Sequence, residues 1–397
     1  MLDQLPENLI IEILSWLPVK SLLQYKSVSK SWYKIIKSRY FMSVHLKHNY
    51  VRRTNNCFIA QFDISQAGGE LMPELIWHGE KDESNTIHDY LSLQHDPPYN
   101  YDICGPCYGI YYLWRSCVGE HDSHRPRRLW NPALHEAKKL PPMIMKPNIS
   151  SNMKYFNEVC GFGFDPVTMD YKVVAIKGYA ITSDRYGLMD YPLSIMIYSL
   201  RTDSWKYSGD LSKHYYIPRA NSCHAFVNRS FYWLGSYEKD PFKHDVIIAI
   251  DLATEECQEI KLPDICIKGS SMTRVTYSEC LMVYNGSIAL VALHNQEREF
   301  DIWTLKGTTW SKELTMELDR WVWKPLGHYS ADNNLVVFAN YLNCLILCDP
   351  DTKETSELKV HVKDGNCKIV SAYKESLVPL NDRNFWDQSD EHQRILV

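Results

Sequence analysis

The chain has 397 residues, enough for one small and one large domain with a sizeable core. Its net charge of −5 is uneven: residues 1–50 carry +4 and the remaining residues carry −9. The acidic remainder argues against general nucleic-acid binding, which needs clustered Lys and Arg, and is compatible with a basic protein partner.

The N-terminus predicts no secretory signal, because Asp3 and Glu7 stand where such a signal carries positive charge. The longest apolar stretch, Leu335–Cys348, is 14 residues long, whereas a helix needs roughly 18 to 20 to span a bilayer. Twelve unevenly spaced cysteines indicate reduced, mostly buried thiols. We therefore expect a protein of the cytoplasm or nucleus, with no membrane partner.

Three short amphipathic helices are predicted within residues 5–36. The first opens at Pro6, closes before Pro18, and carries one apolar stripe made of Leu9, Ile10, Ile13, Leu14 and Leu17. The second starts at Pro18, whose missing N–H costs nothing in a first turn. Its apolar side is Leu22, Leu23 and Tyr25. Ser29 is placed to cap the third helix, which carries Trp32, Ile35 and Ile36.

These helices are too short to enclose all of their apolar side chains. At roughly 25 cal/mol per Å², several kcal/mol of burial would be unrealised if this surface stayed in water. The side chains concerned are Leu5, Pro6, Leu17, Pro18, Val19 and Leu22. The sequence thus predicts a partner helix or groove that covers them; the alternative is an N-terminal cap over the edge of a β-domain.

The order of fixed positions over these roughly 40 residues resembles the F-box. The pattern is LPxxL from Leu5, then IL at Ile13, LP at Leu17, and Leu22, Val28, Lys30 and Trp32. The resemblance implies docking on a Skp-type adaptor, which links the chain to the cullin and RING subunits of a ubiquitin ligase. The docking residues it implies are Leu5, Pro6, Leu9, Ile13, Leu14, Leu17, Pro18, Val19, Leu22, Leu23, Val28 and Trp32.

After about residue 45, short apolar runs bounded by Pro, Gly, Asn and Asp predict successive strands without helices between them. A strand, turn and polar strand recur five times, with Trp130, Tyr198, Ile250, Trp303 and Cys348 at equivalent positions. Their spacings of 68, 52, 53 and 45 residues suit a four-stranded, kelch-like propeller blade. We expect an irregular β-propeller of six to seven blades; two packed β-sheets are the alternative.

Long polar and aromatic connections are the predicted substrate-reading loops of such a propeller. They are Ser65–Asp102, Pro141–Glu158, Tyr179–Tyr191, Asp210–Ser222 and Gly235–His244. Exposed tyrosine is an efficient contact residue, but tyrosines can equally cover the edges of blades. The candidate contact tyrosines are Tyr179, Tyr186, Tyr191, Tyr215, Tyr216 and Tyr237.

Several runs of the β-region resemble the F-box-associated domain of a large plant family. They include RLWNPALHEAKKLPP from Arg128, CGFGFDPVTMDYKVV from Cys160 and SFYWLG from Ser230. Within that family the chain is similar to the S-locus F-box and S-locus-F-box-like members, which implies a basic secreted ribonuclease as a possible substrate. The implied division is an F-box at residues 1–45 and a substrate-recognition domain at residues 46–397.

Two cysteine patterns come near to known chemistry. Cys104 and Cys107 have the spacing of a redox dithiol, but a predicted strand follows where thiol activation needs a helix. With His121 and His124 they approach a zinc-finger spacing, but the histidines are too close together and no helix is predicted there. We interpret Asp165 and Asp203 as turn formers. The basic run His124–Arg128 is interpreted as a solvated turn.

The sequence therefore favours a non-catalytic adaptor without cofactor or metal, which recruits a protein substrate for ubiquitin transfer by another subunit. One alternative is a propeller enzyme capped by the helices, which would need convergent His, Asp or Glu on the funnel side. The other is a scaffold that binds the adaptor without degradation of a substrate.

Overall fold

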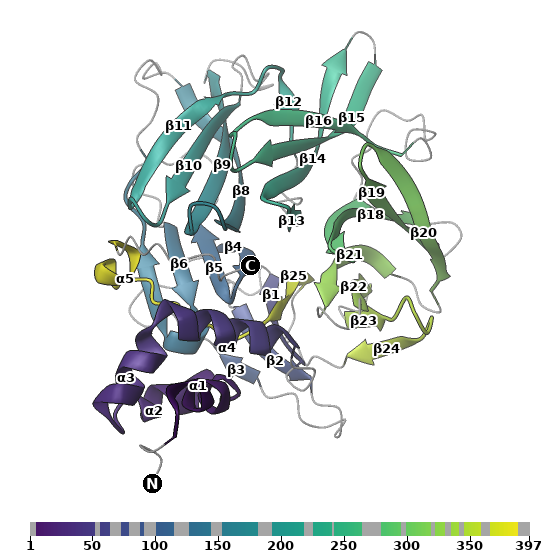
Figure 1. The fold of residues 1–397 in the computed structure, drawn as a ribbon. Coiled ribbons are helices and arrows are strands. Elements are labelled where there is room, and N and C mark those ends of the chain that lie inside the picture. Colours follow the sequence, from purple (N-terminus) through teal and green to yellow (C-terminus); the bar gives the residue numbers. More distant parts are fainter. Residues whose placement is uncertain are drawn as a thin grey trace.

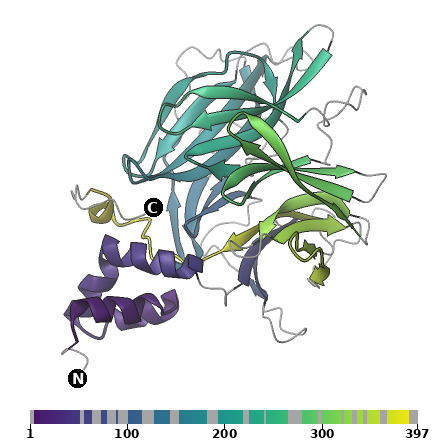
Figure 2. The same cartoon turned by 45° about the vertical axis from the view of Figure 1, so that its right-hand side comes forward.

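The computed structural model describes residues 5–51, 56–63, 73–78, 88–90, 101–114, 127–143, 153–181, 193–217, 225–239, 242–263, 279–294, 299–318, 322–329, 335–340, 345–358 and 366–387. Four helices precede the first described strand, and they lie against one face of a ring of β-sheets (Figures 1 and 2).

The first three helices begin where the sequence predicts, and the first ends before Pro18 as expected. They are α1 (Glu7–Ser15), α2 (Val19–Tyr25) and α3 (Lys30–Lys37). Pro6 and Pro18 are the N-cap residues of α1 and α2. The hydroxyl oxygen of Ser29 accepts a hydrogen bond from the Trp32 N–H at 3.1 Å, so the predicted cap of α3 is confirmed.

A fourth helix, α4 (Arg39–Val51), follows α3 directly and was not predicted. Its inward side carries polar groups as well as apolar ones, with Ser43, His45 and Asn49 buried beside Phe41 and Met42. The imidazole of His45 contacts the carbonyl of Leu17 at 2.9 Å. Because polar residues occupy part of the buried side of α4, its apolar residues do not recur at the helical spacing on which the prediction relied. The helix also passes residue 45, where the domain boundary was expected.

The described strands of the β-region form six antiparallel sheets of four or five strands. The first contains β25 (Asn366–Tyr373), β1 (Asn56–Asp63), β2 (Pro73–His78) and β3 (His88–Tyr90). The second contains β4 (Asp102–Cys107), β5 (Ile110–Trp114), β6 (Arg127–Asn131) and β7 (Glu136–Lys139). The third contains β8 (Met153–Asp165), β9 (Asp170–Ile181), β10 (Ser194–Ser199) and β11 (Ser204–Asp210).

The remaining three sheets follow in chain order. The fourth contains β12 (Tyr215–Tyr216), β13 (Ala225–Val227), β14 (Ser230–Lys239), β15 (Phe242–Asp251) and β16 (Cys257–Lys261). The fifth contains β17 (Glu279–Tyr284), β18 (Ser287–His294), β19 (Glu299–Lys306) and β20 (Thr309–Glu317). The sixth contains β21 (Val322–Tyr329), β22 (Leu335–Asn340), β23 (Leu345–Cys348) and β24 (Thr355–Leu358).

The sheets close into a ring, which makes the β-region a propeller and not a pair of packed sheets. The first strand of each sheet contacts that of the next, in the order β25, β4, β8, β13, β17 and β21, and β21 returns to β25. Closure uses the two ends of the β-region, because β25 pairs with β1 from Cys57 opposite Tyr373 to Asp63 opposite Asn366. Pairing the two ends of the β-region in one sheet closes the ring, and each sheet keeps an edge only at its outer strand.

The repeat seen in the sequence corresponds to the structural repeat. Its five equivalent residues, Trp130, Tyr198, Ile250, Trp303 and Cys348, lie on the third strands of five sheets, β6, β10, β15, β19 and β23. The turn after the third strand also recurs. In five sheets it contains a residue with positive φ, at His135, Asp203, Glu255, Gly307 and Lys353.

The two faces of the propeller differ in their connections, because successive turns of an antiparallel sheet lie at opposite ends. In the four sheets from β4 to β20, the turns from first to second and from third to fourth strands are two to five residues long, and they lie on the side of the helices. There, the 3-10 helix Pro132–Leu134 contacts α2. On the opposite side, the connections between β14 and β15 and between β18 and β19 are two and four residues long. Four other connections on that side include longer stretches of sequence: residues 115–126, 144–152, 182–192 and 264–278. We call this opposite side the far rim.

Asp165, at the end of β8, ties two neighbouring sheets together. Its buried carboxylate accepts hydrogen bonds from Lys172 at 2.9 Å and from the Val167 N–H at 3.1 Å, as expected of a turn former, and it pairs with Arg229 at 3.2 Å. Burial alone would raise the pKa of Asp165, but the hydrogen bonds from Lys172, Thr168 and Val167 outweigh it and lower the pKa.

A carboxyl with a lowered folded-state pKa stabilises the protein above its unfolded-state pKa, and this contribution disappears as the pH falls through the folded-state value. We therefore expect Asp165→Asn to be less stable than the parent protein near about pH 7, and to lose less stability below about pH 4. Thermal melting across this range measures both effects. The exposed Asp351→Asn is the control. Equal acid sensitivity of the Asp165 variant and the parent would contradict the assigned role.

Candidate functional site

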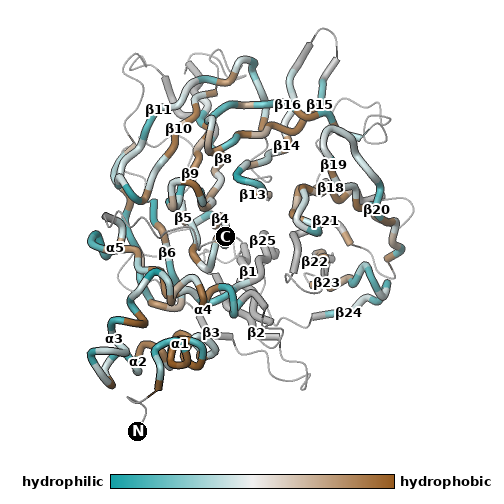
Figure 3. The backbone as a smooth tube through the Cα atoms, in the orientation of Figure 1, coloured by the Kyte–Doolittle hydropathy of each residue, from teal (hydrophilic) through white to brown (hydrophobic). Residues whose placement is uncertain are grey.

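Exposed apolar side chains lie on α1, on α2 and in the turn after α2. Leu9 is 50% exposed, Ile13 54%, Leu23 37% and Val28 61%. Leu9 and Ile13 are one helical turn apart, so they lie on the same side of α1. Figure 3 shows apolar residues in both α1 and α2. We call these four residues the docking patch.

Four residues from the predicted docking set lie inside the helical module instead. Leu14, Val19, Leu22 and Trp32 are at most 8% exposed and form one core with Ile10, Ile35, Ile36, Phe41, Met42 and Leu377. The expectation that Val19 and Leu22 need a partner to leave water was therefore wrong, because the chain itself covers them. Of the other predicted residues, Pro6 and Pro18 are exposed, and Leu5 and Leu17 are partly buried.

Trp16 and Tyr25 also expose apolar surface on this module, although the resemblance did not point to them. The Trp16 ring stacks on His48 of α4 at 4.3 Å, and its indole N–H donates to the Glu12 carboxylate at 3.0 Å. Its position one turn after Glu12 was visible in the sequence. Its contact with His48 was not, because α4 was not predicted.

The candidate contact tyrosines do not share one environment. Tyr216 is 50% exposed, whereas Tyr215 is 1% exposed and donates a hydrogen bond to the Glu259 carboxylate. Tyr237 lies under the Lys213 ammonium at 4.1 Å and stacks on His244 at 5.4 Å. Tyr179 lies on β9 near its far-rim end. Tyr186 and Tyr191 are outside the described residues.

Cys104 and Cys107 lie on strand β4, are buried, and are followed by strand β5. Burial raises the pKa of the Cys107 thiol. This environment opposes thiolate formation. In the part of the chain that the structure describes, no group of three or more His, Cys, Asp and Glu side chains could hold a metal ion. His121 and His124 are not among the described residues.

The basic run His124–Arg128 was expected to be a solvated turn, but its last two residues lie in β6, and Arg127 is 3% exposed. Its guanidinium donates to both carboxylate oxygens of Glu158, at 3.3 and 3.1 Å. The Lys177 ammonium lies 3.9 Å from the same carboxylate. Glu158 and Lys177 are also buried. The sequence did not reveal this buried cluster, because its three members come from three strands.

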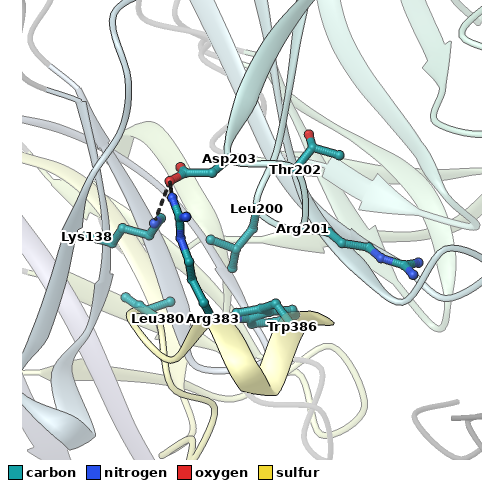
Figure 4. Close-up of a pocket in the computed structure, with 8 residues that line it drawn as sticks. All are labelled: Lys138, Leu200, Arg201, Thr202, Asp203, Leu380, Arg383 and Trp386. Carbon is teal, nitrogen blue, oxygen red and sulfur yellow. Dashed lines mark hydrogen bonds and ion pairs between the residues drawn. The ribbon is translucent and has the colours of Figure 1, made fainter. Parts of the chain in front are cut away.

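A cavity of about 190 Å³ lies where the C-terminal segment meets the propeller (Figure 4). It is lined by Lys138, Leu200, Arg201, Thr202, Asp203, Leu380, Arg383 and Trp386. Asp203 accepts hydrogen bonds from Lys138 at 3.0 Å and from the Tyr198 hydroxyl at 2.7 Å, and lies 3.8 Å from Arg383. Because its carboxylate is shared among these groups, we interpret the cavity as a structural junction.

These features define a class of protein: a small helical module with an exposed apolar patch, joined to a closed β-propeller with long connections on its far rim. No described helix has the length and apolar character needed to cross a membrane.

Comparisons with known proteins identify the family. Residues 2–43 match the F-box domain, and residues 79–369 match the F-box associated beta propeller domain. The second match covers more than half of the chain, so the chain belongs to the plant F-box proteins that carry an F-box-associated domain.

Two curated relatives from Arabidopsis thaliana align along nearly the whole chain. The F-box protein CPR1 is 24% identical over 392 residues, which cover 94% of this chain and 87% of the relative. An F-box/kelch-repeat protein is 24% identical over 398 residues, which cover 95% and 96%. Among solved structures, TolB from Acinetobacter baumannii aligns with 79% of this chain and 66% of its own at 12% identity; its TM-score of 0.45 supports no functional conclusion.

Proposed function

We propose that this protein is the substrate-recognition subunit of an SCF-type ubiquitin ligase, acting in the cytoplasm or nucleus. The docking patch is the observation that carries the proposal, because Leu9, Ile13, Leu23 and Val28 expose apolar surface within the F-box segment. A Skp-type adaptor would cover this patch and connect the chain to the cullin and RING subunits. Burial of apolar surface would be the main driving force.

The chain itself would contribute proximity and no bond chemistry. Fixing a substrate near a charged ubiquitin carrier raises the effective concentration of its lysines. The helices lie on one face of the propeller, so we propose that the substrate binds at the far rim. Four of the five predicted loops, all except Ser65–Asp102, connect strand ends on that side.

Further details of the organisation are proposed on the same basis. The sequence predicted an F-box at residues 1–45. We propose that this docking module extends to the end of α4 at Val51, because α4 is one continuous helix. The substrate-recognition domain follows from β1. Each sheet of the closed ring is proposed to be one blade, which gives a six-bladed propeller.

For the substrate we propose a protein with a basic surface, because residues 51–397 carry a net charge of −9. A secreted ribonuclease of the S-locus type is the particular candidate that the resemblance suggests. Affinity capture from native tissue with the proteasome blocked tests this candidate. A captured basic protein whose level rises on proteasome inhibition only when the docking patch is intact would support degradation. A level that proteasome inhibition does not change would favour a non-degradative scaffold.

The docking proposal predicts that Leu9→Asp combined with Ile13→Asp weakens adaptor binding by about a hundredfold or more, since two carboxylates would be buried in an apolar interface. Both side chains are at least half exposed, so the helical module should keep its fold. A substitution at Leu22 would not distinguish a loss of adaptor binding from a loss of folding, because Leu22 belongs to the core of the helical module.

The measurement is titration of purified Skp-type adaptor on the immobilised full-length chain. Val167→Asp is the matched control, because Val167 is 70% exposed but lies in a turn of the propeller. Unchanged affinity of the double variant, or an equal loss in the control, would refute the assigned surface.

A further inference from the structure

The segment after β25, residues 374–387, runs between the helical module and the propeller and ends in α5 (Arg383–Asp387). We call it the C-terminal strap. Figures 1 and 2 show it leaving β25, passing beside α4 and ending near the sheet of β4–β7. It therefore lies where the two parts of the protein meet.

The first side of the strap faces the helices. The Glu375 carboxylate accepts a hydrogen bond from the Val19 N–H at 2.8 Å, and the Glu375 carbonyl accepts one from Asn49 at 3.1 Å. Pro18 makes no side-chain cap, so Glu375 satisfies an N-terminal donor of α2 from far away in the sequence. Leu377 is 2% exposed and belongs to the core of the helical module.

The opposite side of the strap faces the propeller, and its residues alternate with those that face the helices. The Asn131 side-chain amide donates to the carbonyls of Ser376 and Val378, at 3.0 and 2.9 Å. The Leu380 N–H donates to the Glu136 carboxylate at 2.8 Å. Val378, Leu380 and Trp386 are buried in the core between the sheets of β4–β7 and β8–β11.

The C-terminal end of the strap contacts both the helical module and the propeller. The Lys37 ammonium of the helical module lies 3.0 Å from the Asp382 carboxylate. Arg39 donates to the Phe385 carbonyl, and its guanidinium lies 4.9 Å from the centre of the Phe385 ring. Trp386 packs edge to face on Tyr171 of the propeller at 5.9 Å between ring centres.

From this geometry we infer that the C-terminal strap sets the direction in which the docking patch points relative to the far rim. Glu375, Leu377 and Asp382 are its positioning residues. Four residues, 52–55, join α4 to β1 in the sequence. A second attachment through the strap restricts rotation about that link. The importance of this direction for presenting a substrate rests on the proposed function, but the positioning itself does not.

The test measures the distance between spin labels attached at Lys30 on α3 and Gln258 on β16, both of which are exposed. The intact chain should give one narrow distance distribution. Glu375→Ala combined with Leu377→Ser removes only groups that face the helices, and should broaden the distribution severalfold. Glu354→Ala combined with Val167→Ser, both exposed on the propeller, is the control and should leave it narrow. An equally narrow distribution in the strap variant would overturn the inference.

A second test exchanges the charges of Lys37 and Asp382, so the inference does not depend on whether the Glu375 and Leu377 double variant folds. Lys37→Glu or Asp382→Lys alone places like charges together and should broaden the distribution, whereas the two together restore the pair and should narrow it again. Failure of the exchange to restore the distribution would overturn the role of this pair in positioning. Adaptor binding measured on the same samples distinguishes the docking proposal from the positioning by the strap. If the intact chain does not bind the adaptor, the proposed function is refuted, but the distance distributions still test the strap.

Discussion

Replacement of Glu158 by glutamine is expected to lower the free energy of unfolding of the propeller by about 3 to 5 kcal/mol, the usual cost of removing one partner from a buried ion pair. The carboxylate is buried between the Arg127 guanidinium at 3.1 Å and the Lys177 ammonium at 3.9 Å. Glutamine has nearly the same shape but no negative charge. Two cations would then share a water-poor site without the carboxylate that now lies between them.

Urea titration of the full-length protein, followed by tryptophan fluorescence, measures this loss. Glu313→Gln is the matched control, because Glu313 pairs at 2.7 Å with Lys306, whose side chain is 62% exposed, and such pairs contribute at most about 1 kcal/mol. Adding Lys177→Met to the Glu158 variant removes one of the two cations and should recover part of the stability. If the urea midpoint of the Glu158→Gln variant were as close to that of the parent protein as the midpoint of the control is, the stability of the buried cluster would not depend on the charge of Glu158.

Replacement of Asn131 by aspartate is the second large effect that we expect. The Asn131 side chain is completely buried, and its amide donates to the Ser376 and Val378 carbonyls. Aspartate keeps the oxygen that accepts from the Ala133 N–H but cannot donate to two carbonyls when ionised. Each unsatisfied buried group costs about 1 to 3 kcal/mol, so the strap should lose about 2 to 6 kcal/mol of attachment to the propeller.

Hydrogen exchange measures this effect locally, since the strap amides should exchange faster while those of β17–β20 stay protected. Asn228→Asp is the control, because Asn228 is exposed in the turn between β13 and β14. Unchanged protection of residues 374–387 in the Asn131 variant would contradict the bond assignment.

Parts of the fold that depend on neighbours in the chain were predictable. The starts of α1, α2 and α3 follow from Pro6, Pro18 and the Ser29 cap, which act within one helical turn. The repeat also follows from local features, since the third strand and its turn recur in each unit. The fourth helix was missed because His45 and Asn49 replace apolar residues on its buried side.

The candidate site was only partly predictable. The F-box pattern identified the segment that carries the docking patch, but it did not separate exposed Leu9 and Ile13 from buried Leu14 and Leu22. That separation depends on which side of each helix faces α3, α4 and Leu377, and helical periodicity does not contain this information. Arg127 was assigned to solvent because Glu158 and Lys177 lie on other strands.

The sequence by itself determined that three amphipathic helices, which start after Pro6, Pro18 and Ser29, precede a repeating β-region, because helix-start residues, turns and periodicity act between residues close in the chain. Only the tertiary structure decided which half of the apolar helical surface is exposed, which face of the propeller lies opposite the helices, and how the two parts are joined. The bond between Val19 and Glu375 spans 356 positions, and the one between Asn131 and Ser376 spans 245. Such contacts form only when the ring closes through β25, and no local pattern records them.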